Sequence, residues 1–403
     1  MFCPMCGANL PNDSAFCSQC GRPTGIAGQR PYQSTGATAA QMAATAGAAA
    51  RNAVSSAASK LNEMAGGSGA VKLGFKDFFV EVFKKHSAEE AEELFMCGTP
   101  STTPPLDKVS TAWPRPWLWS RVLVVLIVTF IGLVLLYRFF GNYLAMPGIM
   151  FIGALLIDFA MLIFFFETNA PRNISIAKVV KLFFVGGVAS LLLVMTLINI
   201  IPGSGRGDIV ASLLTGLIEE VAKIAIIVFF MSRMRGRHFV LNGLLIGAAV
   251  GAGFSVFENA GYAFNSYSEF FMSGINYSFS YGESIDLIDL GYQGVMGSTA
   301  IRLLGNLGGH TAWAAVEGAA LALCEKGNGV STSQLLDPRF LTFAGICIVM
   351  HGLWDMYIPV LDDIAIPFTG TLTSVILIIA VWVIIAVMLN RGLAQINGLT
   401  HNE

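Results

Sequence analysis

The chain carries eight apolar segments, each long enough to cross a lipid bilayer as a helix. Their approximate limits are 122–140, 146–166, 179–201, 209–232, 240–264, 296–323, 339–361 and 371–390. Only 12% of the residues are charged, which is about half the share found in a soluble domain. We therefore predict an all-α polytopic membrane protein with about eight transmembrane helices.

The loops between these segments alternate in charge. One loop contains Arg172, Lys178 and Lys181, whereas the long stretch 265–295 contains acidic residues but no lysine or arginine. Because positively charged loops stay on the cytosolic side, this alternation places 265–295 on the outer face. The pattern predicts an integral protein of the cell membrane with both termini in the cytosol.

Two CxxC pairs lie near the N-terminus, Cys3 with Cys6 and Cys17 with Cys20, with ten residues between the pairs. Four thiolates at this spacing predict a closed structural zinc site, in a ribbon over residues 1–23. Such a site has no open coordination position, so we expect an interaction or stability module with a protein partner. The ribbon lacks a basic patch, so nucleic acid is not an expected partner.

Two further stretches separate the ribbon from the first apolar segment. Residues 24–70 are rich in Ala, Gly, Ser and Thr and predict a flexible or partly helical linker. Residues 71–121 contain phenylalanines at helical spacing and predict a cytosolic or interfacial amphipathic segment. That segment lies either on the bilayer or on the protein's own helices. The membrane domain follows over 122–391, and a cytosolic tail over 392–403.

The apolar segment 209–232 contains three ionisable residues, Glu219, Glu220 and Lys223. A charged side chain at the bilayer centre costs about 2.5–3.5 kcal/mol, so such residues need partners and commonly mark function. Lys223 follows the two glutamates by four and three residues, spacings at which side chains meet on a helix. An ion cluster that only fixes helix packing would also explain them, and a functional site requires polar groups on other segments.

Three other segments supply such groups. Glu258 and Asn259 end the fifth, Arg302 and His310 lie in the sixth, and His351 precedes Asp355 by four residues in the seventh. Two imidazoles and a carboxylate are the ligand set of a catalytic zinc with an open water position. We therefore expect a second zinc ion, in addition to the ribbon's.

The expected ligands of that second ion are Glu258, His310 and His351, and a glutamate of segment 209–232 would be the general base. Asp355 would hold His351 through its second ring nitrogen. Asp158, in the second apolar segment, is expected to be structural.

These motifs resemble those of the PrsW-type intramembrane proteases, which are relatives of the CAAX prenyl proteases. The matching residues are Glu219-Glu220-x-x-Lys223, Phe254-x-x-x-Glu258-Asn259, Arg302 followed by His310, and His351-x-x-x-Asp355. The resemblance covers about residues 120–390. The wider family usually has a histidine where Glu258 stands and an asparagine where Asp355 stands, so the chain resembles the PrsW branch.

The resemblance implies hydrolysis of a peptide bond of a membrane-protein substrate, in or beside the bilayer. The best-known role of the family is the first cleavage of a membrane-bound anti-sigma factor. By this likeness Glu219 or Glu220 would activate water, with Glu219 preferred. Asn259 and Asp355 would orient substrate or ligands. Arg302 would stabilise a developing oxyanion or pair with a carboxylate.

A protein without enzymatic activity is the alternative. A multi-span scaffold, receptor or transporter also buries ionisable side chains, as an ion or proton relay. No internal repeat of segments is evident in the sequence, and the ionisable groups crowd into the fourth to seventh segments. The two classes differ in their response to substitution, because a hydrolase loses all activity on Glu219→Ala or His351→Ala while still folding.

Overall fold

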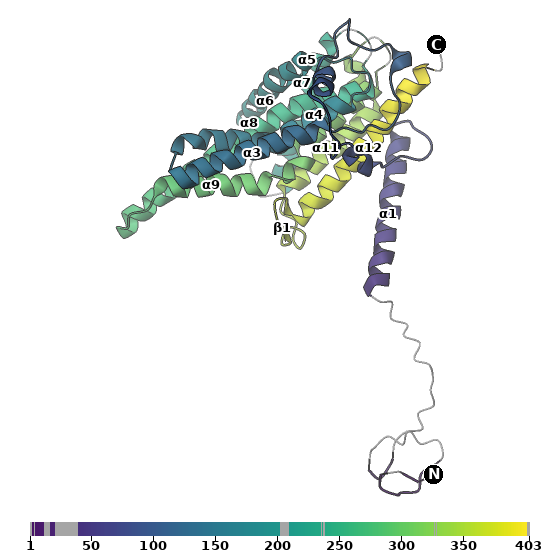
Figure 1. The fold of residues 1–403 in the computed structure, drawn as a ribbon, viewed down its shortest axis with the longest axis vertical. Helices are drawn as coiled ribbons and strands as arrows, with labels where there is room; N and C mark the ends of the chain where they lie inside the picture. The colour runs from purple at the N-terminus through teal and green to yellow at the C-terminus, as the bar shows by residue number, and fades with distance from the viewer. Residues whose placement is uncertain are drawn as a thin grey trace. The chain divides into compact units, whose positions relative to one another are not determined.

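The computed structural model describes residues 2–3, 5–11, 17–20, 39–201, 209–234, 236, 238–325, 327 and 329–400 (Figure 1). The chain divides into two compact units, Met1–Val54 and Ser55–Glu403, and each is described by itself. Helix α1 (Ala39–Met64) lies within the predicted linker 24–70. Its alanine-rich sequence favours a helix, so this part of the linker is helical.

The four cysteines of the N-terminal unit come together. The Sγ atoms of Cys3 and Cys20 lie 3.8 Å apart, and those of Cys6 and Cys17 lie 3.6 Å apart. Zinc–sulfur bonds of about 2.3 Å in a tetrahedron place sulfur atoms about 3.8 Å from one another. Hydrogen bonds from the backbone N–H groups of Met5 and Cys6 lower the pKa of the Cys3 thiol to about 6. The separations of the four sulfur atoms therefore fit a structural zinc ion.

The second unit is a helical bundle, and among its described residues five helical segments are long and apolar enough to cross a membrane. They are α3 (Leu118–Phe140), Tyr143–Thr168 with α4 (Met146–Thr168), Ile176–Ile200, α8 (Val240–Tyr281) and Leu372–Leu399 in α12 (Leu372–Thr400). Other parts of the chain bury 94% of the apolar stretch of α8 but only 6% of the apolar stretch of α3. Helix α8 is therefore central, and α3 is left to face lipid.

The remaining three predicted segments differ in form. Helix α7 (Ile209–Arg233) is continuous and contains the three charged residues. Helix α11 (Pro338–Asp355) ends before the predicted limit at residue 361. The prediction of one helix over 296–323 is wrong, because the chain forms α9 (Leu287–Arg302) and α10 (His310–Leu323) with a 3-10 turn between them. The all-α membrane class is confirmed, and the count of about eight spans stays a prediction.

The interruption between α9 and α10 follows from packing on α12. The 3-10 turn covers Gly305–Gly308, and a Cβ added at Gly308 would lie 2.6 Å from Cγ1 of Ile378. The indole Nε1 of Trp382 donates a hydrogen bond to the carbonyl of Leu307 at 2.9 Å. Irregular backbone within a bilayer requires such protein partners for its polar groups. Helix α10 consequently begins in the interior of the bundle.

Helices α8 and α10 approach closely because glycines line their contact. A Cβ at Gly247 would lie 1.9 Å from the carbonyl oxygen of Ala314, and one at Gly251 would lie 2.4 Å from that of His310. Small residues allow helix backbones to meet in this way within membranes. This contact fixes the start of α10 against the middle of α8.

Residues 71–121 were predicted as an amphipathic segment, and they do not form one continuous helix. A 3-10 helix (Phe75–Phe79) and α2 (Ala88–Phe95) lie within them. The ring of Phe78 is buried, 5.7 Å from that of Trp113 and 4.9 Å from that of Phe164 on α4. Phe78 therefore packs on the protein's own helices, and the interfacial character of the segment stays a prediction.

Shorter elements complete the unit. The segment Ile176–Ile200 consists of α5 (Ile176–Lys181), a π-helical turn (Leu182–Gly186) and α6 (Gly187–Ile200). Single 3-10 turns lie at Leu106–Lys108, Tyr143–Ala145 and Thr332–Leu336, and β1 (Ala365–Ile366) pairs antiparallel with β2 (Gly370–Thr371). Helices α8 and α9 form a hairpin whose tip projects beyond the neighbouring helices (Figure 1).

Candidate active site

The three ionisable residues of α7 point into the bundle. Glu220 and Lys223 are fully buried, and Glu219 is 6% exposed. The Lys223 ammonium donates to Oε1 of Glu220 at 2.8 Å, which is the pairing that their spacing on the helix predicts. A buried ion pair is stable only when further hydrogen bonds satisfy it. Those partners come from two other helices.

His351 of α11 is the first partner. Its Nδ1 lies 2.5 Å from Oε1 of Glu220, and its Nε2 lies 3.6 Å from Oε2 of Glu219 and 3.5 Å from Oδ2 of Asp355. Because an ionised carboxylate only accepts hydrogen bonds, Nδ1 carries the proton shared with Glu220. The imidazole also stacks on the indole of Trp313, with ring centroids 4.7 Å apart. The ring is therefore fixed with Nε2 directed at Glu219.

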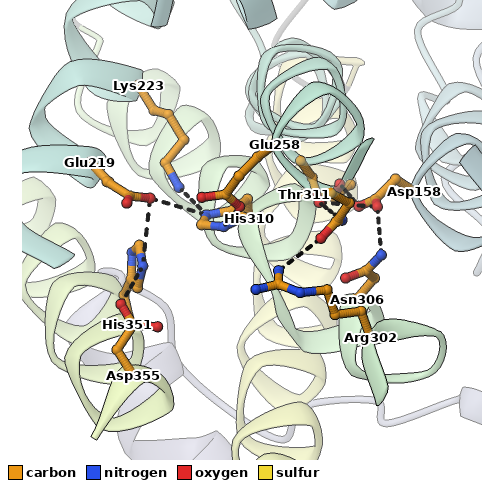
Figure 2. A network of polar contacts seen from close by, with 12 residues as sticks. Asp158, Glu219, Lys223, Glu258, Arg302, Asn306, His310, Thr311, His351 and Asp355 are labelled. Atoms are coloured by element: carbon orange, nitrogen blue, oxygen red, sulfur yellow. Dashed lines mark hydrogen bonds and ion pairs between the residues drawn. The ribbon is translucent and has the colours of Figure 1, made fainter. Parts of the chain in front are cut away.

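His310 is the second partner and stands at the first residue of α10. Its Nε2 donates to Oε2 of Glu258 at 2.9 Å, and its Nδ1 accepts from the Lys223 ammonium, also at 2.9 Å. The same Nδ1 lies 3.9 Å from Oε2 of Glu219. Figure 2 shows both imidazoles directed at the Glu219 carboxylate from different helices. Each imidazole is held by a carboxylate on its other nitrogen.

The residues predicted to form one site therefore divide into two groups. Seven of them make one connected cluster, namely Glu219, Glu220, Lys223, Glu258, His310, His351 and Asp355. The other two form a pair beside it, in which Nη1 of Arg302 donates to Oδ1 of Asn259 at 2.8 Å. Arg302 also stacks on the ring of Tyr262, so its closest described partners are an amide and a ring.

Two groups among the described residues have the composition and closeness of a metal site. One is the four-cysteine cluster, and the other is Glu219, His310 and His351, whose ligand atoms all lie within 4.8 Å of one another. Ligands about 2.1 Å from a tetrahedral zinc ion are separated by about 3.4 Å. The 3.6 Å and 3.9 Å separations from Glu219 are near that value.

The geometry favours a different carboxylate from the one expected at this site. Oε2 of Glu219 is buried without a hydrogen-bond partner among the described residues, so it is available to a ligand. Glu258 instead accepts the proton of His310 Nε2 and lies outside the group of three. A cation on Nδ1 of His310 would replace its contact with Lys223, which keeps its bond to Glu220. If the ion replaces Lys223 as the partner of His310 Nδ1, the residues present fit a zinc ion.

A buried aspartate adjoins the cluster. From the sequence, this residue was expected to be structural. Asp158 of α4 is fully buried and accepts hydrogen bonds from Thr311, Ser255 and Asn306 (Figure 2). The signal in the sequence is a lone carboxylate within an apolar segment, a position that generally requires partners. Its partners could not be identified from spacing, because they lie on other helices.

Glu317 of α10 is a further buried carboxyl group. It is 1% exposed, and neither of its oxygens has a hydrogen-bond partner among the described residues. It therefore adds to the ionisable groups held inside the bundle without joining the hydrogen-bonded cluster.

The bundle contains two imidazoles, each held by a carboxylate, beside a glutamate oxygen that has no hydrogen-bond donor among the described residues. These are groups that an intramembrane hydrolase requires. The model of the PrsW family intramembrane metalloproteases matches residues 174–388, and that of a zinc-ribbon domain matches residues 2–24. The chain belongs to the PrsW family of intramembrane metalloproteases. No curated protein and no solved structure shows a significant match.

Membership in this family decides between the two classes that the sequence left open. The chain is an integral membrane protein and an intramembrane peptidase, which acts on membrane-protein substrates within the lipid bilayer. The ribbon match and the four-cysteine cluster support a structural zinc ion at the N-terminus.

Proposed function

We propose that the chain hydrolyses a peptide bond of its membrane substrate with a water molecule activated at Glu219. One observation supports this most strongly. Oε2 of Glu219 is buried, has no hydrogen-bond partner among the described residues, and faces a ring nitrogen of both His310 and His351. A carboxylate without a donor in a water-poor site is a strong proton acceptor, and the two imidazoles define where water would sit.

The neighbouring residues take supporting roles in this proposal. Glu220 and Glu258 each hold one imidazole in a fixed orientation, as carboxylates commonly do for catalytic histidines. Lys223 compensates the charge of the glutamates and bridges Glu220 to His310. Because Glu220 is bound by Lys223 and His351 through its Oε1, Glu219 is the better candidate for the base.

Glu219, His310 and His351 would also hold the second zinc ion. When bound, such an ion makes a water molecule more acidic and polarises a carbonyl group. Oε2 of Glu219 would then be a ligand, and its second oxygen would remain to accept the proton. Asp355 lies 3.5 Å from the same Nε2 of His351 that faces Glu219, whereas Glu220 holds the second ring nitrogen. Asp355 would therefore orient the substrate, and the expectation that it holds the second nitrogen is replaced by Glu220.

Arg302 and Asn259 would form the substrate-facing part of the site. Arg302 is bound to a neutral amide and keeps donors for a substrate carbonyl or a developing oxyanion. From the family's best-known role, we propose an anti-sigma-factor-like regulator as the substrate. The proposed setting is the cell membrane, with both termini in the cytosol and the ribbon available to a protein partner.

The proposal is tested by reconstituting the full chain in liposomes with a single-span membrane peptide and measuring cleavage. Glu219→Gln keeps the shape of the side chain and removes the proton acceptor, so cleavage should fall by about 10²–10⁴-fold. Glu269→Gln is the matched control, because Glu269 is exposed on α8 and contacts Asn265 outside the cluster. Cleavage by Glu219→Gln at the wild-type rate would exclude Glu219 as the base.

A further inference from the structure

Asp158 lies outside the residues that the family model matches. Its carboxylate nevertheless accepts hydrogen bonds from residues on both sides of His310, a candidate catalytic residue. Oδ1 accepts a hydrogen bond from Thr311 at 2.6 Å, and Oδ2 accepts one from Asn306 at 3.0 Å. Thr311 directly follows His310, and Asn306 stands four residues before it. One carboxylate on α4 therefore spans the turn from which α10 begins.

The same carboxylate is tied to α8. Ser255 donates to Oδ2 of Asp158 at 3.0 Å and accepts from Nδ2 of Asn259 at 3.1 Å. Asn259 in turn accepts from Arg302, the last residue of α9. The chain of hydrogen bonds thus begins at the end of α9, passes through α8 to α4, and returns to the first turn of α10 (Figure 2).

These hydrogen bonds restrain the non-helical connection between α9 and α10. Seven residues, 303–309, separate α9 from α10 and contain three glycines. Glycine-rich backbone without a continuous helix has more conformations to choose from than the helices beside it. His310 is the first residue after that stretch, so its imidazole is only as well placed as the turn that carries it.

We propose that Asp158 is a positioning residue for the peptidase reaction, which fixes the turn before α10 and thereby directs the His310 imidazole at Glu219 and Glu258. The inference rests on the proposed function, because it requires His310 to act in catalysis. Among the described residues, the hydrogen bonds of Asp158 go to Ser255, Asn306 and Thr311, and none goes to the cluster around Glu219. It acts through Thr311 and Asn306.

Asp158→Asn tests the proposal in the full chain, since it preserves volume but turns an acceptor into a donor that faces Asn306 and Ser255. A misplacement of a reacting group by about 1 Å can cost 10²-fold, so we expect kcat to fall by about 10- to 100-fold with KM nearly unchanged. Asp158→Asn combined with Asn306→Asp reverses donor and acceptor across the same contact and should recover most of the lost kcat.

A second variant covers the case in which Asp158→Asn does not fold. Thr311→Val removes one donor without changing the shape of the side chain, and it should lower kcat by a smaller factor. Asn242→Ala is the matched control, because Asn242 is a buried polar link between α8 and Asn169 and Asn173, outside the cluster. It should lower the unfolding temperature and leave kcat unchanged in the folded protein.

The outcomes separate the two proposals. Wild-type kcat in both Asp158→Asn and Thr311→Val, with an inactive His310→Ala, would overturn the positioning role and leave the proposed function standing. Activity in His310→Ala would overturn the proposed function as well. A lower unfolding temperature of Asp158→Asn with unchanged kcat would show a purely structural role and would also reject the inference.

Discussion

Oε2 of Glu219 on α7 lies 3.6 Å from Nε2 of His351 on α11. The approach depends on two glycines, since a Cβ at Gly216 would lie 3.0 Å from the backbone nitrogen of Gly352. Larger residues there would separate the two helices. The carboxylate and the imidazole are therefore held together by backbone packing, and we expect them to act as a unit.

His351→Gln should abolish most of the activity. Glutamine can form a hydrogen bond to Glu220, but it lacks the ring nitrogen that faces Glu219. We expect kcat to fall by about 10²–10⁴-fold with the fold intact, as measured by peptide cleavage in liposomes. His86→Gln is the control, because His86 lies in the segment before α3 and bonds to Glu90. Near-normal cleavage by His351→Gln would contradict the role assigned to this imidazole.

The full chain should bind two zinc ions, one in the ribbon and one at the membrane site. Replacing Cys17 and Cys20 by serine should remove one ion and leave peptide cleavage unchanged. His351→Ala should remove the other ion and abolish cleavage. Elemental analysis of the purified proteins measures both numbers. Two ions in His351→Ala would argue against a metal at Glu219, His310 and His351, without affecting the assignment of the ribbon.

Lys223→Met should strongly destabilise the bundle. It leaves Glu220 buried without its cation, and removal of one partner from a buried ion pair costs about 3–5 kcal/mol. The double variant with Glu220→Gln removes both charges and should recover part of that loss. Denaturant unfolding of the solubilised protein measures the free energies. Lys178→Met, at an exposed position, should have little effect. A double variant no more stable than Lys223→Met would contradict the cost assigned to the unpaired Glu220 carboxylate.

Gly247→Ala should destabilise the contact of α8 with α10, because the new Cβ would lie 1.9 Å from the carbonyl oxygen of Ala314. Forcing extra volume into a packed core costs about 1–3 kcal/mol. Gly261→Ala is the control on the same helix, since a Cβ there meets nothing within 4 Å. Unfolding temperatures of the two variants give the comparison. A similar loss in both would point to the glycine backbone itself instead of the contact.

The sequence determined the class of the protein and most of the residues at its centre. Apolar length and the scarcity of charge require helices in a bilayer, because lipid offers no partner for an unpaired backbone group. The same reasoning singles out Glu219, Lys223 and His351, since an ionisable group within an apolar segment needs a reason to be there. The two CxxC pairs predicted the ribbon from spacing alone.

Only the tertiary structure decided how those residues are paired. Helical periodicity predicts contacts within one helix, such as that of Lys223 with Glu220, but not which helix lies opposite. The interruption before His310 depends on the packing of Gly308 against α12, a contact between residues about 70 positions apart. Asp158 acquires its three donors in the same way, from side chains on other elements. Such long-range contacts follow from the close packing of the whole bundle, and no local stretch of sequence encodes them.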